Sequence, residues 1–332
     1  MTQTFRIPEF ADIEAAARRI APWAVVTPLL ESPALNARAG TRVLLKVEPF
    51  QRTGSFKFRG ACNRILLIPE AERKGGVVAF SSGNHAQGVA AAAGLFGLAA
   101  TIVMPADAPR AKIEGTRAYG AKIVSYDRKR DDREAIARRI QEETGATLIK
   151  PFDDPFIVAG QGTAGLEMAA QARALDCEIG RVFVPVSGGG LLAGISLAFA
   201  QMSPATKVMA VEPDSYDGMG RSLVAGMRVA APADKSSIAD SLQAPTPGEV
   251  PFAVAKNHVA GGVAVTDDDL ARAVSYAVRT LKIVVEPGGA AGLAALLSSN
   301  LHNKSEAVGV VLSGGNVDPE TIADCCARFP QP

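Results

Sequence analysis

Short runs of β-branched and apolar residues alternate with amphipathic stretches along this chain from Arg42 onward. Strands that alternate with helices pair in parallel through crossover connections, so this alternation restricts the chain to an α/β fold. The predicted strands, each ended by turn residues or a helical stretch, occupy 42–48, 77–81, 100–105, 122–126, 147–151, 181–186, 207–213 and 307–313.

Two of the intervening stretches carry clear helix signals. Residues 266–281 begin with Thr266, and Asp269 three positions later completes a capping box. Residues 131–145 form an amphipathic stretch that stops at Gly145, a residue that favours the end of a helix.

The length of 332 residues exceeds one ordinary domain, so we expect two lobes that share a crevice. Residues 53–152 contain consecutive strand-helix units, and the flanking segments read as parts of a second sheet. We therefore expect a small substrate-side domain at 53–152 and a large cofactor-binding domain made of 1–52 and 153–332.

Charge and composition exclude several classes of function. The 35 Lys and Arg residues balance 34 Asp and Glu, so the chain lacks the excess of positive charge that would bind nucleic acid or an anionic membrane. The first twenty residues lack the basic start and apolar stretch of a signal peptide, and no run of 18 apolar residues could span a bilayer, so we expect a cytoplasmic protein. The cysteines lack metal-binding or disulfide spacing and are expected to be reduced packing residues: Cys62, Cys177, Cys325 and Cys326.

Five short motifs follow predicted strands or open helices. Each places glycines, a hydroxyl or a single charged group where open α/β sheets bind ligands, at the carboxyl ends of the strands. The motifs are GSFKFRGA at 54–61, SSGNHAQG at 81–88, SGGGLLAG at 187–194, EPGGAAG at 286–292 and SGGN at 313–316.

The SGGGLLAG motif follows a strand and opens a helix, so its main-chain N–H groups can surround one compact phosphate. It is neither a dinucleotide fingerprint nor a nucleoside-triphosphate loop. A glycine turn needed only for close packing is the alternative interpretation. The candidate phosphate ligands are Ser187, Gly188, Gly189, Gly190 and Leu191.

Lys57 lies between Phe56 and Phe58 just before a predicted helix, an apolar setting that favours a neutral, nucleophilic amine able to form a Schiff base. Taken alone, the same residue reads as a solvated surface lysine. Ser313 ends a strand and precedes two glycines, so a flat ring could approach the backbone while the hydroxyl meets a ring nitrogen. An ordinary strand-end turn is the alternative there.

In SSGNHAQG, the residues before and at the helix start could bind a substrate carboxylate through hydroxyls, an amide and free N–H groups. We expect His85, which lies within the helix start, to be a packed residue rather than a catalytic base. The candidate substrate-binding residues of this loop are Ser81, Ser82, Gly83, Asn84 and His85.

Together and in this order, the five motifs resemble the fold-type II pyridoxal-phosphate enzymes, and most closely their serine/threonine dehydratase and serine racemase branch. The resemblance implies a tryptophan synthase β-like fold, with two open, mostly parallel sheets and helices on both faces. It also implies that Lys57 carries pyridoxal 5′-phosphate, Asn84 bonds the ring hydroxyl, residues 187–191 hold the phosphate and Ser313 meets the ring nitrogen. Glu286 is expected on the cofactor side or in a structural role.

The activity that the resemblance implies is dehydration and deamination of L-threonine, L-serine or a related β-hydroxy amino acid to a 2-oxo acid and ammonia. Amino-acid racemisation is an alternative, because Ser82 stands where serine racemases carry a second acid/base residue. Arg133 resembles an arginine that reaches a substrate's distal group, which suits threo-3-hydroxyaspartate, although a surface arginine is the simpler interpretation. A catalytically idle binding protein is the alternative from another class.

The racemase branch also binds Mg²⁺ or Ca²⁺ beside a Glu-Pro motif, and Glu212 and Asp217 are the matching residues here. Hard cations require several oxygen ligands, and Gly218 stands where that branch commonly has a second aspartate. This departure weakens the expectation of a metal. The resemblance further implies a homodimer that acts on a small amino acid.

Overall fold

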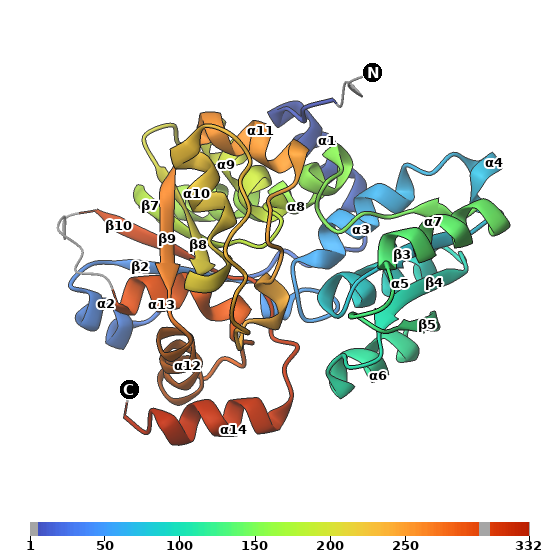
Figure 1. Ribbon diagram of the computed structural model, residues 1–332. Helices are drawn as coiled ribbons and strands as arrows, with labels where there is room; N and C mark the ends of the chain where they lie inside the picture. The colour runs from blue at the N-terminus through green and yellow to red at the C-terminus, as the bar shows by residue number, and fades with distance from the viewer. Residues whose placement is uncertain (1–5, 299–305, 332) are drawn as a thin grey trace.

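The computed structural model describes residues 6–298 and 306–331. The protein contains two separate sheets, each flanked by helices (Figure 1). The strands are β1 Leu29–Glu31, β2 Val43–Val47, β3 Val77–Phe80, β4 Ala100–Pro105, β5 Lys122–Tyr126, β6 Thr147–Leu148, β7 Ile179–Pro185, β8 Lys207–Pro213, β9 Val259–Val265 and β10 Ala307–Leu312.

The larger sheet has six strands in the order β1-β2-β10-β7-β8-β9, and only the edge strand β1 is antiparallel. Both of its faces are buried. In β10, Val308, Val310 and Leu312 belong to the core shared with α12 and α13, whereas Ala307 and Val311 pack with α8 and α9 on the other face. This two-sided burial explains why the strand sequences are continuous apolar runs.

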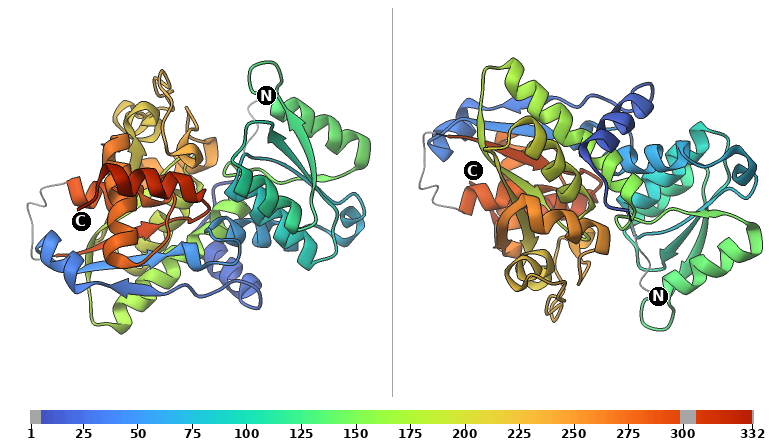
Figure 2. Two further views of the ribbon diagram at one scale, coloured as in Figure 1. Left: turned by 90° about the horizontal axis from the view of Figure 1, so that it is seen from below. Right: turned by 90° about the horizontal axis from the view of Figure 1, so that it is seen from above.

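The smaller sheet has four parallel strands in the order β5-β4-β3-β6. In β3, Val77 and Ala79 pack with α3 and α5, while Val78 and Phe80 face α7. Both views of Figure 2 show the two sheets, with their helices, lying side by side. The expected α/β architecture of two mostly parallel sheets with helices on both faces is confirmed.

Helices connect nearly all successive strands and place the motifs at their ends. They are α1 Phe10–Ile20, α2 Pro33–Ala39, α3 Lys57–Leu66, α4 Glu70–Arg73, α5 Asn84–Leu95, α6 Arg110–Ala118, α7 Arg133–Thr144, α8 Pro155–Ala174, α9 Gly190–Met202, α10 Gly218–Ala225, α11 Glu249–His258, α12 Asp267–Tyr276, α13 Ala291–Ser298 and α14 Pro319–Arg328. Short turns of helix include η1 Glu48–Phe50, η3 Asp240–Leu242 and η5 Gly288–Ala290.

Most local predictions are confirmed. All predicted strands are present, Thr266 and Asp269 form the capping box of α12, and α7 ends at Gly145 in the left-handed region with φ of 70°. The predicted 266–281 helix continues past Tyr276 as a π-helical turn. Two strands, β1 and β9, were not predicted, because β1 has three residues at a sheet edge and β9 contains two adjacent glycines.

All four cysteines are free, and only Cys326 is not buried, in line with the packing role expected. Within the described residues, no helix has the length and apolar character needed to cross a bilayer. The domain boundaries at 52/53 and 152/153 stay predictions, although the smaller sheet does draw its strands from 77–148.

Candidate active site

A pocket of about 180 Å³ lies where the ends of β3, β6, β7 and β10 come together. All five sequence motifs contribute residues to its wall. The predicted cofactor and substrate residues line this one pocket: Lys57, Ser81, Ser82, Gly83, Asn84, His85, Arg133, Ser187, Gly188, Gly189, Gly190, Leu191, Glu286 and Ser313.

Lys57 is the first residue of α3, and its amine faces the pocket. Nζ donates a hydrogen bond to the main-chain oxygen of Pro151 at 2.8 Å and lies 5.1 Å from the centre of the Phe56 ring. Burial lowers the pKa of Lys57 to about 8, and the charge of Glu286 only partly opposes this. About a tenth of this amine is therefore neutral and nucleophilic at pH 7, far more than for a lysine with the ordinary pKa of 10.5.

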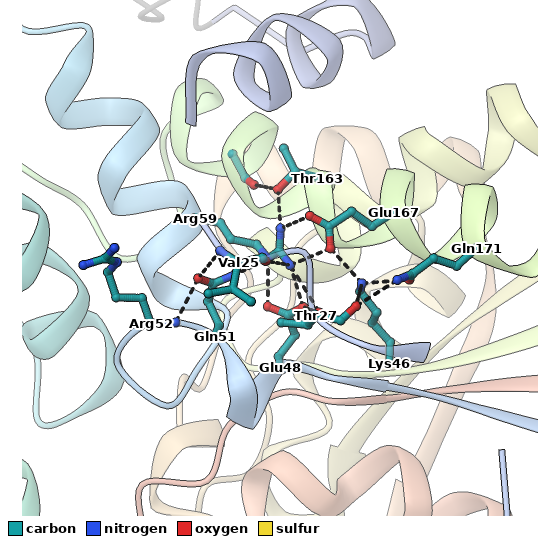
Figure 3. Close-up of polar contacts among 11 residues, drawn as sticks. Val25, Thr27, Lys46, Glu48, Gln51, Arg52, Arg59, Thr163, Glu167 and Gln171 are labelled. Carbon is teal, nitrogen blue, oxygen red and sulfur yellow. Dashed lines mark hydrogen bonds and ion pairs between the residues drawn. The ribbon is translucent and has the colours of Figure 1, made fainter. Parts of the chain in front are cut away.

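Arg59, two residues after Lys57 in α3, is the centre of a network of polar contacts (Figure 3). Its guanidinium is fully buried and makes bidentate contacts with Glu48, at 2.8 and 2.9 Å, and with Glu167, at 2.6 and 2.8 Å. Lys46 completes the group through a 2.7 Å contact with Glu167. The network thus joins η1, α8 and β2 to the first turn of α3, which begins at Lys57.

The charges in this network are mutually compensated. Burial opposes ionisation of Glu48, but the facing Arg59 and Lys46 outweigh it and hold the pKa of that carboxyl below its ordinary value. Thr27 donates to Glu48 at 2.6 Å, which adds a further hydrogen bond to the charged carboxylate. A buried charge group with complete pairing is stable as a unit and strongly destabilised when one member is removed.

The SGGGLLAG loop has the geometry of an anion cradle. Gly189 adopts φ of 94°, which lets the chain turn sharply into α9, and a Cβ at Gly188 would lie 2.3 Å from the Phe152 ring. The first N–H groups of α9 have no carbonyl partner within the helix and therefore suit an anion. Gln161, which is buried beside Gly190, has no hydrogen-bond partner for its amide within the described residues. These features fit a phosphate group, as the resemblance implies.

Asn84 is held between two residues of the larger sheet's loops. Asn316 Nδ2 donates to Asn84 Oδ1 at 2.9 Å and to the Thr53 oxygen at 2.8 Å. Asn84 Nδ2 in turn makes a short hydrogen bond to Glu286 Oε1. Both atoms of the Asn84 amide are therefore oriented before any ligand binds.

Sequence reasoning missed three residues at this site. Lys112, on α6, lines the pocket, and its amine lies 2.7 Å from Asp240 and 3.1 Å from Glu286. Asn316 belongs to the quoted SGGN motif, but it had been given no role. Lys112 and Asp240 stand alone in unremarkable sequence, so only the three-dimensional contact identifies them.

Two of the predicted substrate-binding residues, His85 and Arg133, differ in burial and charge. His85 is buried, its Nε2 lies 2.9 Å from the Ile149 oxygen, and burial lowers its pKa to about 3, so it is neutral at ordinary pH. This agrees with a packed residue rather than a base.

Arg133 begins α7 and is exposed, with its guanidinium 5.3 Å from the centre of the Phe80 ring. Neighbouring Arg128, by contrast, is paired with Asp107 at 2.7 Å.

The expected divalent-metal residues line a second pocket. Both oxygens of Glu212 accept main-chain N–H groups, from Met219 and Gly220, each at 2.8 Å, and Asp217 pairs with Arg221 at 2.6 Å. Burial raises the pKa of Glu212 to about 8, although the two N–H donors partly oppose this. No group of three potential His, Cys, Asp or Glu ligands occurs in residues 6–298 and 306–331. The residues present do not fit the metal expected.

Comparison with known proteins places the pocket in context. Residues 20–314 match the family described as pyridoxal-phosphate dependent enzyme. The chain is 43% identical to an L-threo-3-hydroxyaspartate ammonia-lyase from a Pseudomonas species, over 96% of this chain and 98% of that protein. It is 40% identical to a serine racemase from Schizosaccharomyces pombe, over 97% and 98% of the two chains.

A solved structure shares the fold throughout. The crystal structure of a T.th. threonine deaminase superposes with a TM-score of 0.88 at 45% identity, and covers 94% of this chain and 99% of that chain.

Proposed function

Because the chain belongs to the family of pyridoxal-phosphate dependent enzymes, in the serine/threonine dehydratase and serine racemase branch, we propose that it deaminates a small β-hydroxy amino acid to a 2-oxo acid and ammonia. The observation that carries this proposal is the Lys57 amine, whose pKa of about 8 leaves it reactive in a pocket that also contains the glycine-rich anion cradle.

Pyridoxal phosphate, when bound, supplies the electron withdrawal that makes the α-proton of an amino acid acidic. The residues of the chain provide the rest. The SGGGLLAG loop would hold the phosphate, Asn84 would orient the ring and Ser313 would bond its nitrogen. Lys57 Nζ, once free, is the base that takes the α-proton, since a neutral amine held beside the substrate carbon suits this step.

The substrate carboxylate is proposed to bind at Ser81 to His85, where the start of α5 offers main-chain N–H groups. At the ring nitrogen, the Ser313 hydroxyl is a weaker proton source than a carboxylic acid. A hydroxyl partner would leave the bound ring a weaker electron acceptor, which suits elimination better than transamination.

The test is a 2-oxo acid assay on the purified protein with L-threonine, L-serine and threo-3-hydroxyaspartate, together with a visible absorption spectrum. We expect a cofactor band and product in the wild type, and neither in Lys57→Ala. Lys122→Met, at an exposed lysine of β5, is the matched control and should retain both. A wild-type protein that takes up no cofactor would refute the proposal.

Threo-3-hydroxyaspartate is the second candidate substrate, and a specific observation favours it. Arg133 lines the pocket and has no salt-bridge partner in the described part of the chain, so its charge is available to a second carboxylate. The nearby Arg128 is already engaged with Asp107. The ammonia-lyase relative from Pseudomonas bears the name of this substrate.

Racemisation is the second candidate reaction, supported by Ser82 in the pocket wall and by the serine racemase relative. A racemase needs an acid/base group in addition to Lys57, and the Ser82 hydroxyl would serve. Ser82→Ala should then abolish D-serine formation, followed by chiral chromatography, and leave elimination from L-serine intact. Equal loss of both activities would argue against this role.

We also propose that the protein is a cytoplasmic homodimer, as the family resemblance implies. Light scattering of the purified holoenzyme tests the oligomeric state. A mass of one chain would contradict it.

A further inference from the structure

Lys112 occupies an unusual place for a lysine, because the residue is 2% exposed and its amine lies in the pocket wall. It belongs to α6, which connects β4 to β5 of the smaller sheet. Its contacts belong to the part of the chain that forms the larger sheet: Asp240 begins η3, between α10 and α11, and Glu286 precedes η5, between α12 and α13. The main-chain N–H of the adjacent Ala111 also donates to Asp318 Oδ1 at 3.3 Å. The start of α6 is therefore a bridge between the two sheets.

The stem of Lys112 also supports the SSGNHAQG loop. A Cβ at Gly83 would lie 2.7 Å from Lys112 Cδ, so the lysine chain fills the space beside that glycine. The amine beyond it lies between the two carboxylates, 2.9 and 2.7 Å from the oxygens of Asp240. The Lys112 side chain thus packs against the loop and places a positive charge beside Glu286.

Glu286 is the next link. Its Oε2 faces Lys112 at 3.1 Å, and its Oε1 accepts the short hydrogen bond from Asn84 Nδ2. The side chain is 1% exposed, so its orientation depends on these partners rather than on water. Asn316 holds the opposite end of the Asn84 amide.

We propose that Lys112 is a positioning residue whose ammonium orients the Glu286 carboxylate, which in turn fixes the side-chain amide of Asn84 towards the cofactor ring. The inference rests on the proposed role of Asn84 in the pyridoxal-phosphate site. It adds a residue from α6 that no sequence motif contains.

The ionisation state of Glu286 depends strongly on Lys112. Burial raises the pKa of Glu286, and the Lys112 ammonium, the Asn84 amide and the more distant Lys57 oppose this, whereas Asp240 adds to it. Desolvation also opposes the charge of Lys112, but Glu286 and Asp240 outweigh it and raise the pKa of the lysine. Without Lys112, Glu286 Oε2 loses the charged partner at 3.1 Å, and the pKa of the Glu286 carboxyl group rises further, so that it takes up a proton more readily.

The test is a double-mutant cycle of Lys112→Met, Glu286→Gln and the double variant, with the dissociation constant for pyridoxal phosphate as the readout. We expect each single variant to raise the dissociation constant about tenfold. The dissociation constant of the double variant should be no higher than that of the single variant that binds less tightly, because the two residues act in series. Additive losses would overturn the proposal.

A second readout does not depend on the cofactor. Infrared difference spectra of Lys112→Met against wild type should contain the carbonyl stretch of a protonated carboxyl group, and this band should be absent from the double variant. Its absence from Lys112→Met would overturn the proposal.

Lys122→Met, which removes an exposed lysine of β5 outside the pocket, is the matched control, and its cofactor affinity should stay within about threefold of wild type. A loss as large as that of Lys112→Met would overturn the proposal. Glu286→Gln, which removes the charge on the other side of the contact, covers failure of Lys112→Met to fold, and wild-type affinity in that variant would also overturn the proposal. A wild-type protein that binds no pyridoxal phosphate would instead refute the proposed function itself.

Discussion

Asn316 donates from Nδ2 to Oδ1 of Asn84 at 2.9 Å, although the two residues are 232 positions apart in the sequence. The same Nδ2 reaches the Thr53 oxygen at 2.8 Å, next to the motif that contains Lys57. Asn316 therefore connects the SGGN, SSGNHAQG and GSFKFRGA segments at one point of the pocket.

Replacement of Asn316 should disturb cofactor binding more than stability. In Asn316→Leu, the Asn84 amide loses the donor that fixes its oxygen, and we expect affinity for pyridoxal phosphate to fall about threefold to tenfold, since such hydrogen bonds contribute about 1 kcal/mol. Fluorescence titration measures the affinity. Asn257→Leu, at an exposed residue of α11, should bind as the wild type does. Equal affinities for the two variants would contradict this role for Asn316.

The lowered pKa of Lys57 predicts how cofactor uptake depends on pH. Only the neutral amine attacks an aldehyde, so the rate at which the cofactor-free protein captures pyridoxal phosphate should rise with pH through a midpoint of about 8. Stopped-flow absorbance at a series of pH values gives this midpoint. A midpoint near 10.5, the ordinary value for lysine, would mean that the amine is solvated.

The glycine at 188 is required by the space that surrounds it. In Gly188→Ala the new Cβ would lie 2.3 Å from the Phe152 ring, so either the loop or the ring must move. We expect a loss of about 1–3 kcal/mol in the free energy of unfolding, together with weaker cofactor binding.

Gly94→Ala provides the contrast, because the added Cβ in α5 meets only the Tyr119 oxygen at 3.5 Å. This variant should be more stable than the wild type by about 0.4–1 kcal/mol. Denaturant unfolding of both variants measures the difference, and similar behaviour of the two would contradict the steric argument.

Removal of Arg59 should be severely destabilising. Arg59→Met leaves Glu48 buried without its bidentate partner, and we expect the free energy of unfolding to fall by about 3–5 kcal/mol. Because the pKa of Glu48 is lowered by folding, its contribution is present above the unfolded value of about 4.5 and is lost as pH falls through the lower folded value.

The difference in stability between Arg59→Met and wild type should therefore shrink at acid pH. Urea unfolding at several pH values measures it. Arg138→Met, which removes an exposed arginine of α7, should change stability by less than about 0.5 kcal/mol. A constant difference at every pH would exclude Glu48 as the group responsible.

Arg133 should determine specificity rather than turnover in general. In Arg133→Gln, kcat/KM for threo-3-hydroxyaspartate should fall about tenfold to a hundredfold, because a carboxylate loses its charged partner, while kcat/KM for L-threonine should change little. Arg130→Gln, at an exposed arginine outside the pocket, is the control. Parallel losses for both substrates would place Arg133 outside the specificity pocket.

The sequence was sufficient for the parts of the molecule that are encoded locally. Strand runs, the Thr266 capping box and the glycine motifs depend on neighbouring residues, and each appears where it was predicted. The position of the pocket could be predicted because parallel sheets bring the carboxyl ends of their strands to one edge.

Contacts between distant segments could not be predicted in the same way. Lys112 resembles any other lysine of an amphipathic helix, and Asp240 lies in a loop without a motif, so their pairing emerges only from the packing of α6 against the other sheet. The misfit between Glu212 and the expected metal has a similar origin. The N–H groups of Met219 and Gly220 that bond to Glu212 belong to the first turn of α10, which follows the motif.

The position of β10 in its sheet has a consequence for synthesis on the ribosome. It is the last strand along the chain, yet it lies between β2 and β7 in the middle of the six-stranded sheet. Until it leaves the exit tunnel, β2 lacks its parallel neighbour and the apolar edge of β7 is uncovered. This sheet can therefore close only after residues 307–312 have been made, and until then the edges of β2 and β7 are open to non-native pairing with other strands.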